Sequence, residues 1–243
     1  MWKRNGSPPR AVGRPVPSHF PSWGGRGAGF AVGVGLGLVY ALFQYQLLPR
    51  RVAGVVAKLY FWPTMPFTLL QRWDNYWTTM DDTLLVGAAP VAALGHVEAL
   101  VGEGVTRIVN MCAEYRGPVQ LYSDLGMEEL WLPTLDHEEP SLADMRRAVD
   151  FIAASEKKGY RTLVHCKSGH GRSTAIAMAW MLYRNPALTP RQVQADMLAK
   201  RRVRNSLYKQ ANVRRFYKEL STGAAGAAIS ASQRDRGKQR LSL

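Results

Sequence analysis

Cysteine is scarce in this chain of 243 residues, and acidic residues are absent from its first 73 positions. The two cysteines, Cys112 and Cys166, supply no disulfide framework, so the protein need not belong to an oxidising compartment. The sequence also lacks zinc-ligand spacing, a DNA-recognition helix and an aromatic RNA-binding motif. These absences argue against nucleic acid as the partner, although the net charge is +14.

The positive charge lies at the two ends of the chain. Residues 1–73 carry nine basic and no acidic residues, a net charge of +9. Residues 74–199 carry 11 basic and 16 acidic residues, a net charge of −5, and residues 200–243 carry 12 basic and two acidic ones, a net charge of +10. Basic ends around a mildly acidic body indicate an anionic membrane surface or an import pathway.

The extensions have distinct compositions. Residues 1–26 are rich in Arg, Pro, Gly and Ser, which predicts a disordered or targeting segment. Residues 27–48 carry no charge over 22 positions, long enough for a candidate membrane anchor; a cleaved targeting region and a glycine-rich surface segment are the alternatives. Residues 49–80 predict an amphipathic segment that leads into the domain and lies on a membrane or against the domain. Residues 221–243 predict a disordered basic tail.

The body of the chain, residues 81–220, alternates short β-type runs with helical stretches, which predicts an α/β fold. We expect a central, mostly parallel or mixed sheet of about four or five strands flanked by helices. Capping signals at Ser141 and at Thr189-Pro190 mark two helix starts. The expected strands are 83–87, 107–111, 129–132 and 162–165, and the expected helices are 91–101, 142–156, 173–183, 190–201 and 210–220.

The most informative stretch is HCKSGHGRST, from His165 to Thr174. An apolar strand candidate leads into it and an apolar helix candidate leads out. Backbone N–H groups converge in such a loop, and the helix dipole favours negative charge. Gly169 and Gly171 let the backbone turn tightly and approach an anion. The stretch therefore predicts a phosphate-binding loop, formed by Lys167, Ser168, Gly169, His170, Gly171 and Arg172.

Three side chains of the loop have the chemistry of a phosphatase. Arg172 offers a planar fork for two phosphate oxygens. Cys166 lies where this cation and the helix N-terminus lower the pKa of a thiol, which favours the nucleophilic thiolate. Ser173 can donate a hydrogen bond to that thiolate. The C-x5-R-[ST] spacing is the signature of cysteine-dependent phosphatases; a buried, inert cysteine beside a surface arginine is the alternative interpretation.

A cysteine phosphatase also needs a general acid for the leaving alkoxide. In this superfamily the acid is an aspartate on a loop roughly 30 residues before the cysteine, and Asp136 lies at that distance, after a strand candidate. Asp136 is therefore the candidate acid, with His137, Glu138 and Glu139 as neighbouring competitors.

Five stretches carry a resemblance to a known family. They are HCKSGHGRST, Leu132–Asp136 with Pro140-Ser141-Leu142, Asn110–Tyr115, Arg72-Trp73 with Asp81–Pro90, and Tyr60–Thr64. In these stretches, which span about residues 59 to 220, the chain resembles the mitochondrial protein-tyrosine-phosphatase-like enzymes. That family is a branch of the dual-specificity phosphatases that dephosphorylates phosphatidylglycerophosphate. The resemblance implies the cysteine-dependent phosphatase fold for residues 81–220.

The resemblance also implies roles for matching residues. Cys166 would be the nucleophile, Arg172 the phosphate clamp and Asp136 the acid. Glu114 would support Arg172 through a charge-assisted hydrogen bond, with His165 as a further supporting residue. The family tends to have an acidic residue where this chain has Arg116, which puts the network around Glu114 in doubt.

The expected function is hydrolysis of a phosphomonoester through a phosphocysteine intermediate, without cofactor or metal. The resemblance makes phosphatidylglycerophosphate, in cardiolipin synthesis at the mitochondrial inner membrane, the expected substrate. Lys167 adds positive charge to the pocket, which favours an anionic phospholipid. A dual-specificity protein phosphatase and a phosphate-reading module without turnover are the alternatives. A regulatory disulfide between Cys112 and Cys166 is a further hypothesis.

Overall fold

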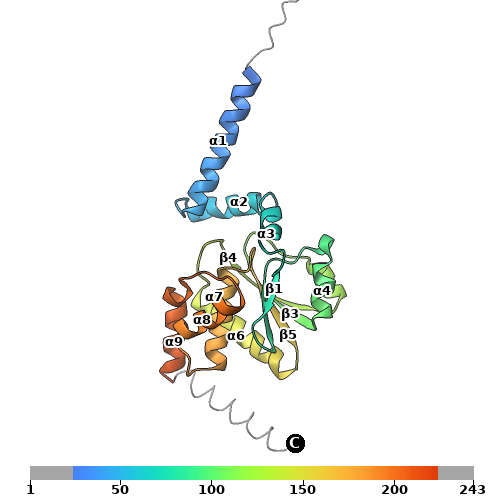
Figure 1. Ribbon diagram of the computed structural model, residues 1–243, viewed down its shortest axis with the longest axis vertical. Coiled ribbons are helices and arrows are strands. Elements are labelled where there is room, and N and C mark those ends of the chain that lie inside the picture. Colours follow the sequence, from blue (N-terminus) through green and yellow to red (C-terminus); the bar gives the residue numbers. More distant parts are fainter. Residues whose placement is uncertain (1–23, 224–243) are drawn as a thin grey trace, which may run out of the picture. The chain divides into compact units, whose positions relative to one another are not determined.

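The computed structural model describes residues 24–223, with side chains from residue 33 onward (Figure 1). Most of the predicted targeting segment, 1–26, and of the predicted basic tail, 221–243, lies outside this range. The chain divides into two units at residue 41, and the second unit, Leu42–Leu243, contains the whole of the predicted phosphatase body. The fold below is that of the second unit.

A five-stranded sheet forms its centre, in the order β1-β2-β5-β3-β4. The strands are β1 (Trp77–Thr79), β2 (Leu84–Gly87), β3 (Val105–Cys112), β4 (Glu128–Thr134) and β5 (Arg161–His165). Strands β2, β5, β3 and β4 pair in parallel, and β1 pairs antiparallel with β2 at one edge. The predicted α/β class and mixed sheet are therefore confirmed.

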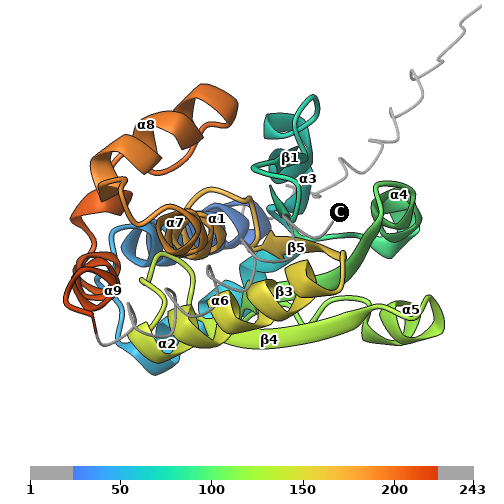
Figure 2. The ribbon, with the colours of Figure 1, turned by 90° about the horizontal axis from the view of Figure 1, so that it is seen from below.

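The central strands β2, β3 and β5 are largely buried on both faces, and their neighbouring residues point to opposite sides of the sheet. Leu84 and Val86 pack in one apolar cluster with helices α6 to α9, whereas Leu85 belongs to a second cluster with α4. Figures 1 and 2 show the same division, with α4 on one side of the strands and α7 and α9 on the other. Two apolar layers thus hold the central strands in a fixed register.

Most predicted helices occur within one or two residues of the expected bounds. They are α6 (Leu142–Lys157), α7 (Arg172–Arg184), α8 (Pro190–Lys200) and α9 (Ala211–Ser221). Ser141 caps α6 by accepting the Asp144 N–H at 3.0 Å, and Thr189 forms a capping box with Gln192 at α8.

The single helix predicted over residues 91–101 is wrong in one respect. Gly95 has a left-handed φ of 68°, which ends a short 3₁₀ turn, η1 (Ala92–Leu94), before α4 (His96–Gly102) begins. A glycine adopts this conformation without steric cost, so the chain bends here although the apolar pattern continues. A second 3₁₀ turn, η2 (Leu207–Lys209), precedes α9.

Several short elements were not expected from the sequence. They are the edge strand β1, helix α5 (Val119–Asp124) and helix α3 (Met65–Gln71). Helices α1 (Gly24–Gln44) and α2 (Arg50–Phe61) occupy most of the segments predicted as an anchor and an amphipathic segment. Within the part of the chain whose side chains are described, no helix combines the length and the apolar character that a membrane crossing requires.

The carboxyl ends of three parallel strands meet at one edge of the sheet. β3 ends at Cys112, β4 at Thr134 and β5 at His165, and α7 begins at Arg172 on the same edge. Open α/β sheets bind their ligands at this edge. The topology therefore brings the three predicted active-site segments together.

Candidate active site

The loop between β5 and α7 is held by the backbone around it. The Ala89 N–H donates to the carbonyl of Lys167 at 3.1 Å, and the Arg204 N–H donates to the carbonyl of His170 at 2.9 Å. Thr174, in the first turn of α7, donates its hydroxyl to the same His170 carbonyl at 2.8 Å. Within the described residues, none of the N–H groups of residues 167–171 donates a hydrogen bond, so these groups are available to an anion.

Gly169 is the position at which this loop requires glycine. Its φ is +64°, and an added Cβ would lie 2.6 Å from the backbone C and O of Gly87. We expect Gly169→Ala to lower the free energy of unfolding by at least about 2 kcal/mol, since strain and overlap add. Urea denaturation with Gly171→Ala as the control tests this: a Cβ at Gly171 meets only Arg204 atoms, at 3.5 Å. Equal losses in both variants would contradict the prediction.

Cys166 lies at the base of the loop and is 3% exposed. The Ser173 hydroxyl donates a hydrogen bond to its Sγ at 3.3 Å. Burial alone raises the pKa of a thiol, but the charge of Arg172 and the hydrogen bonds from Ser173 outweigh it, so the pKa of Cys166 is lowered. The other thiol, Cys112, has its pKa raised well above the usual value, chiefly by burial. Both cysteines are free.

We expect Ser173→Ala to shift the alkylation of Cys166 to higher pH. The hydrogen bond from Ser173 lowers the pKa of the thiol, so its removal leaves less thiolate at any given pH below the midpoint. The rate of reaction with iodoacetamide, followed against pH in a Cys112→Ser background, measures the midpoint. An unchanged or lower midpoint would contradict the assigned hydrogen bond.

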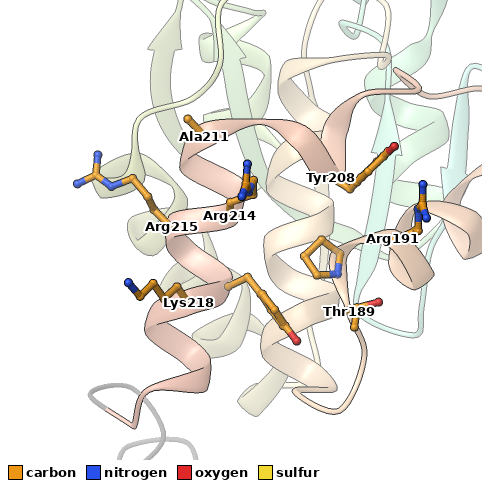
Figure 3. A pocket seen from close by; sticks show the side chains of 9 residues that line it. Thr189, Arg191, Tyr208, Ala211, Arg214, Arg215 and Lys218 are labelled. Carbon is orange, nitrogen blue, oxygen red and sulfur yellow. The ribbon is translucent and has the colours of Figure 1, made fainter.

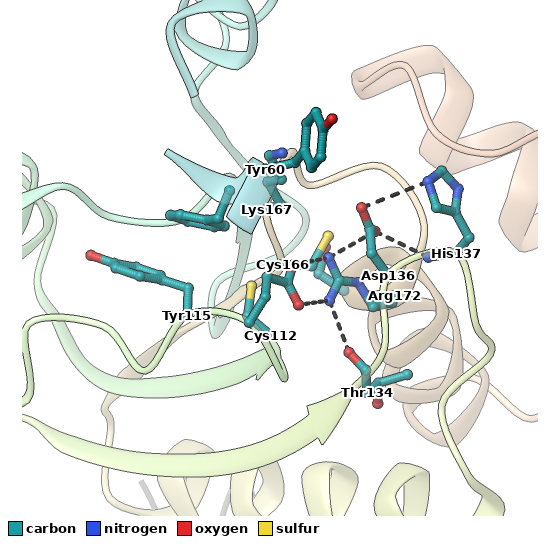
Figure 4. Close-up of polar contacts among 12 residues, drawn as sticks. Tyr60, Cys112, Tyr115, Thr134, Asp136, His137, Cys166, Lys167 and Arg172 are labelled. Atoms are coloured by element: carbon teal, nitrogen blue, oxygen red, sulfur yellow. Dashed lines mark hydrogen bonds and ion pairs between the residues drawn. The ribbon is translucent and has the colours of Figure 1, made fainter. Parts of the chain in front are cut away.

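Arg172 lies at the centre of the site, and its side chain is 1% exposed (Figure 4). Its guanidinium donates to both carboxylate oxygens of Glu114, at 2.7 and 2.8 Å, and to the carbonyl of Thr134 at 2.9 Å. It is also ion-paired with Asp136 Oδ1 at 2.8 Å. Its Nε is buried and donates no hydrogen bond within the described residues. A buried donor without an acceptor, beside a thiol of lowered pKa, fits a phosphate oxygen.

The predicted contact of Glu114 with Arg172 is present, and Arg116 does not disturb it. Arg116 instead forms an ion pair with Glu129 and lies 4.6 Å from the ring centroid of Trp131. The loop that carries Glu114 is fixed by Tyr115, whose hydroxyl donates to the Pro90 carbonyl at 2.6 Å. Arg116 thus pairs with a residue of β4 and leaves the contact between Glu114 and Arg172 intact.

Asp136 is the acidic residue of its loop that reaches the site. The competing carboxylates have other partners: Glu138 pairs with Arg50 at 3.0 Å, and Glu139 accepts the backbone N–H groups of Asn212 and Val213 at the start of α9. Burial raises the pKa of Asp136, but the charges of Arg172, His137 and Lys167 outweigh burial and lower it.

The segment that precedes α2 contacts the loop of Asp136 and holds it in place. Gln46 Nε2 donates to the carbonyl of His137 at 2.9 Å, and the ring of Phe43 meets the His137 ring edge-on at 5.4 Å between centroids. Gln46 and His137 are the two non-glycine residues with positive φ in the described chain, at 58° and 67°. Such conformations persist only where the surrounding contacts hold them.

Lys167 faces the segment between α2 and α3. Its ammonium donates to the Thr64 hydroxyl and lies 5.6 Å from the ring centroid of Phe61. Burial lowers the pKa of Lys167, and the charges of Asp136 and Glu114 oppose this effect. Phe61 in turn stacks on Tyr115 with centroids 4.6 Å apart. The segment before the sheet therefore contributes one wall of the site.

Two buried cations near the loop were missed in the sequence. Arg201, 2% exposed, donates to the carbonyls of Gly169 at 3.0 Å and Ser168 at 3.3 Å, and to that of Asn75 at 2.7 Å. Arg72, 5% exposed, donates to the Arg202 carbonyl at 3.3 Å. They are two of 17 basic residues in the stretches 1–73 and 200–218, and the sequence alone does not distinguish them from surface cations.

The remaining predicted residues surround the loop. His165 is fully buried, and burial lowers its pKa to about 3, so the ring is neutral. His170 Nδ1 lies 3.3 Å from the Arg202 carbonyl, at the outer side of the loop. In the described part of the chain, no group of three His, Cys, Asp or Glu side chains is arranged to hold a metal ion.

Known proteins share this arrangement. The sequence model of the dual specificity phosphatase catalytic domain matches residues 91–212. A relative from Arabidopsis thaliana named phosphatidylglycerophosphate phosphatase PTPMT2 is 34% identical over 147 residues, which are 58% of this chain and 64% of the relative. The chain thus spans less than two thirds of that protein.

Two further similarities are of the same kind. The human phosphatidylglycerophosphatase and protein-tyrosine phosphatase 1 is 28% identical over 139 residues, covering 52% of this chain and 69% of the relative. A crystal structure of PTPMT1 superposes with a TM-score of 0.55 at 25% identity, covering 62% of this chain and 99% of that chain.

Proposed function

Because this chain belongs to the dual specificity phosphatase family, we propose that it is a cysteine-dependent phosphatase that converts phosphatidylglycerophosphate to phosphatidylglycerol. The observation that carries the chemistry is the convergence of Cys166, Arg172 and Asp136. A thiol of lowered pKa, a buried guanidinium with one unpaired N–H and a carboxylate meet at the loop.

In the first step, Cys166 Sγ attacks phosphorus and the bond from phosphorus to the leaving oxygen breaks. Arg172 Nε and the loop N–H groups take the phosphoryl oxygens, where negative charge accumulates. Glu114 holds the guanidinium through two hydrogen bonds, so its orientation is fixed before substrate binds. Ser173 stabilises the thiolate when it later departs.

Asp136 supplies the proton for the leaving oxygen. The ion pair with Arg172 lowers the pKa of Asp136 and so favours the carboxylate. A general acid must instead be protonated. A phosphate bound to Arg172 competes for the same Nη2 and carries negative charge. Both effects raise the pKa of Asp136 in the complex, so substrate binding prepares the acid.

In the second step, water hydrolyses the phosphocysteine. Asp136, now a carboxylate, accepts a proton from the water as its oxygen attacks phosphorus. The bond between phosphorus and Cys166 Sγ breaks, inorganic phosphate leaves and the thiolate is restored. Each group returns to its initial state, so one residue serves as acid and then as base.

The substrate part of the proposal rests on the relatives and on Lys167. Both named relatives are phosphatidylglycerophosphate phosphatases. Lys167 places a second cation within the site, next to the segment before the sheet. The human relative's name also includes protein-tyrosine phosphatase, so phosphotyrosine in a protein is the second candidate substrate.

A substrate panel tests the choice. Purified full-length protein is assayed for phosphate release from phosphatidylglycerophosphate in detergent, phosphoinositides and phosphotyrosine, phosphoserine and phosphothreonine peptides. We expect the highest kcat/KM for phosphatidylglycerophosphate. A higher kcat/KM for the peptides would reject the lipid substrate, and no release from any of them would support a phosphate-reading module.

We expect Gln46→Ala to slow turnover roughly two- to tenfold, the worth of one hydrogen bond. Without the bond to the His137 carbonyl, the loop holds Asp136 less firmly over the site. The loss should be larger for an alkyl phosphate, which needs the acid, than for an aryl phosphate. Gln44→Ala, two positions earlier and also exposed, is the matched control. Equal effects of the two substitutions would contradict the proposal that the hydrogen bond from Gln46 to His137 positions Asp136.

We also propose a mitochondrial location with association to the inner membrane. This proposal rests on the resemblance in the five stretches above and on the absence of acidic residues from positions 1–73. The mass of the mature protein, measured after isolation from mitochondria, tests whether residues 27–48 are retained as an anchor or removed with a targeting segment.

A further inference from the structure

We propose that one face of helices α2 and α3 docks on an anionic bilayer and so holds the active site against the membrane surface. This inference rests on the lipid substrate proposed above and adds the surface that meets the lipid. We call it the apolar face. It comprises seven exposed side chains: Val52, Val55, Leu59 and Trp62 on and just after α2, and Phe67, Leu70 and Trp73 on and just after α3.

The spacing of these residues places them on one side of each helix. Val52, Val55, Leu59 and Trp62 follow one another at intervals of three, four and three residues, which is one stripe of an α-helix. The opposite side of α2 is buried against the domain through Val56, Ala57 and Phe61. The stripe is therefore apolar without being part of the core.

The side chains of the apolar face are unusually exposed for large apolar residues. Leu59 is 67% exposed, Phe67 68%, Leu70 77% and Trp73 85%. Single exposed apolar residues are common on proteins, but seven within 22 residues, on two consecutive helices, are a concentration that points to an interaction site. Tryptophan, phenylalanine and leucine beside basic residues are the composition of helices that lie in the membrane interface.

Charge selects an anionic bilayer as the occupant. Arg51 and Lys58 are exposed on α2 beside the stripe, whereas Arg50, the first residue of the helix, is paired with Glu138. No acidic residue occurs before Asp74, so nothing on α2 or α3 opposes an anionic surface. Each such cation near an anionic membrane contributes roughly 1 kcal/mol. A protein partner with an apolar groove would not require this uniform sign of charge.

The apolar face is continuous with the active site. A surface cavity of about 500 Å³ is lined by Arg51, Val55 and Lys58 from α2 and by Ala113 and Leu135. These last two residues directly precede Glu114 and Asp136. The same segment also reaches the loop through Thr64, which bonds Lys167. A bilayer seated on the face would thus present its headgroups beside the catalytic residues.

A second cationic surface provides an internal comparison. A cavity of about 630 Å³ between α8 and α9 is lined by Arg191, Arg214, Arg215 and Lys218 (Figure 3). Its lining contains no residue of the active site, and it lacks the exposed tryptophan, phenylalanine and leucine of the apolar face. If positive charge alone were enough for membrane docking, this second surface should dock as well. It therefore serves as a control for the contribution of the apolar side chains.

The first experiment locates the bilayer on the full-length protein. An environment-sensitive fluorophore is attached to Leu70→Cys or, as the control, to Leu94→Cys, which is 52% exposed in η1. Cys166→Ser removes the reactive thiol, and Cys112 is buried. On adding vesicles of phosphatidylcholine with phosphatidylglycerol, we expect a blue shift at position 70 and none at position 94. A label at 70 that stays in water while the protein sediments with vesicles overturns the proposal.

The second experiment separates docking from catalysis. Leu59→Ser/Phe67→Ser/Leu70→Ser should lower kcat/KM roughly 10- to 100-fold on substrate embedded in vesicles, because the apolar contribution to membrane binding is lost. Activity on a soluble aryl phosphate should remain within about twofold, since none of the three residues is placed in the chemistry. Leu94→Ser/Leu125→Ser/Leu198→Ser removes as many exposed apolar side chains elsewhere and should change neither activity.

The third experiment compares the removal of two positive charges from each of the two surfaces. Arg51→Gln/Lys58→Gln should weaken sedimentation with anionic vesicles roughly 10- to 30-fold at low salt, whereas Arg214→Gln/Arg215→Gln should leave it unchanged. Equal weakening by both pairs would overturn the assignment of the face. So would a label at position 70 that is already shielded without vesicles, which would mean that a protein segment or second copy covers it.

These outcomes are independent of the proposed substrate. If the protein releases no phosphate from phosphatidylglycerophosphate in detergent, the proposed function fails, and the fluorophore and sedimentation measurements still decide the docking. If detergent-dispersed lipid is hydrolysed and the apolar face makes no difference on vesicles, the docking fails and the function stands.

Discussion

Cys166→Ser should abolish phosphate release from every substrate, a loss of more than roughly 10⁴-fold. The lowered pKa of Cys166 increases the fraction of its side chain present as thiolate, whereas a serine hydroxyl at the same position stays protonated and is a poor nucleophile. Substrate binding should persist, because Arg172 and the loop N–H groups are unchanged. Phosphate release and equilibrium binding of a phosphomonoester, measured on the same preparation, test both statements.

The matched control is Cys112→Ser. Cys112 is buried, and burial raises its pKa well above the usual value, so it is not expected to react. This variant should keep its activity and form the phosphocysteine, detectable by mass spectrometry of acid-quenched protein. Turnover in Cys166→Ser, or a phosphoryl group found on another residue, would reject the assigned nucleophile.

Asp136→Asn should slow the hydrolysis of an alkyl phosphate by roughly 10² to 10⁴, the usual worth of general acid catalysis. The amide cannot donate a proton as an acid or accept one from water. An aryl phosphate needs less protonation of its leaving oxygen, so its first step should lose far less. In the wild type, the rate should fall as pH rises through the pKa of Asp136 in the complex, because the acid must be protonated; this limb should be absent in the variant.

Glu138→Gln provides the neighbouring control. Glu138 pairs with Arg50 at the surface and does not contact Arg172, so its loss should cost no more than about threefold, in keeping with an exposed ion pair. Comparable losses in the two variants would show that the loop as a whole, and not one carboxylate, is responsible. An Asp136→Asn enzyme with full activity on the alkyl ester would reject the acid outright.

The loop from Cys166 to Arg172 was predictable because its determinants are local. Cys166 and Arg172 lie in one short turn between a strand and a helix, so their spacing in sequence nearly fixes their spacing in space. The fold class was equally accessible, since β-type and helical runs alternate along the body, and the structure confirms a mixed five-stranded sheet. The match over residues 91–212 confirms the dual specificity phosphatase family, of which the branch expected from five short stretches is a part.

The errors arose where local pattern and tertiary packing disagree. The apolar run from Val91 to Val101 predicts one helix, but Gly95 adopts a left-handed φ and divides it. Strand β1 has three residues and was overlooked, because pairing with β2 and not its own sequence makes it a strand. The role of Arg201 was missed because the local sequence does not distinguish a buried arginine from a surface arginine.

The sequence alone determined the reacting pair and the architecture that carries it, because both depend on residues a few positions apart. The sequence offered Glu114 by resemblance and Asp136 among competitors, and only the tertiary structure decided which side chains contact Arg172. Glu114 grips Arg172 across 58 residues of chain, Arg201 supports Gly169 across 32, and Asp136 and not Glu138 or Glu139 reaches the guanidinium. The apolar face likewise exists only in three dimensions, since the packing of α2 and α3 decides which apolar side chains the core leaves outside.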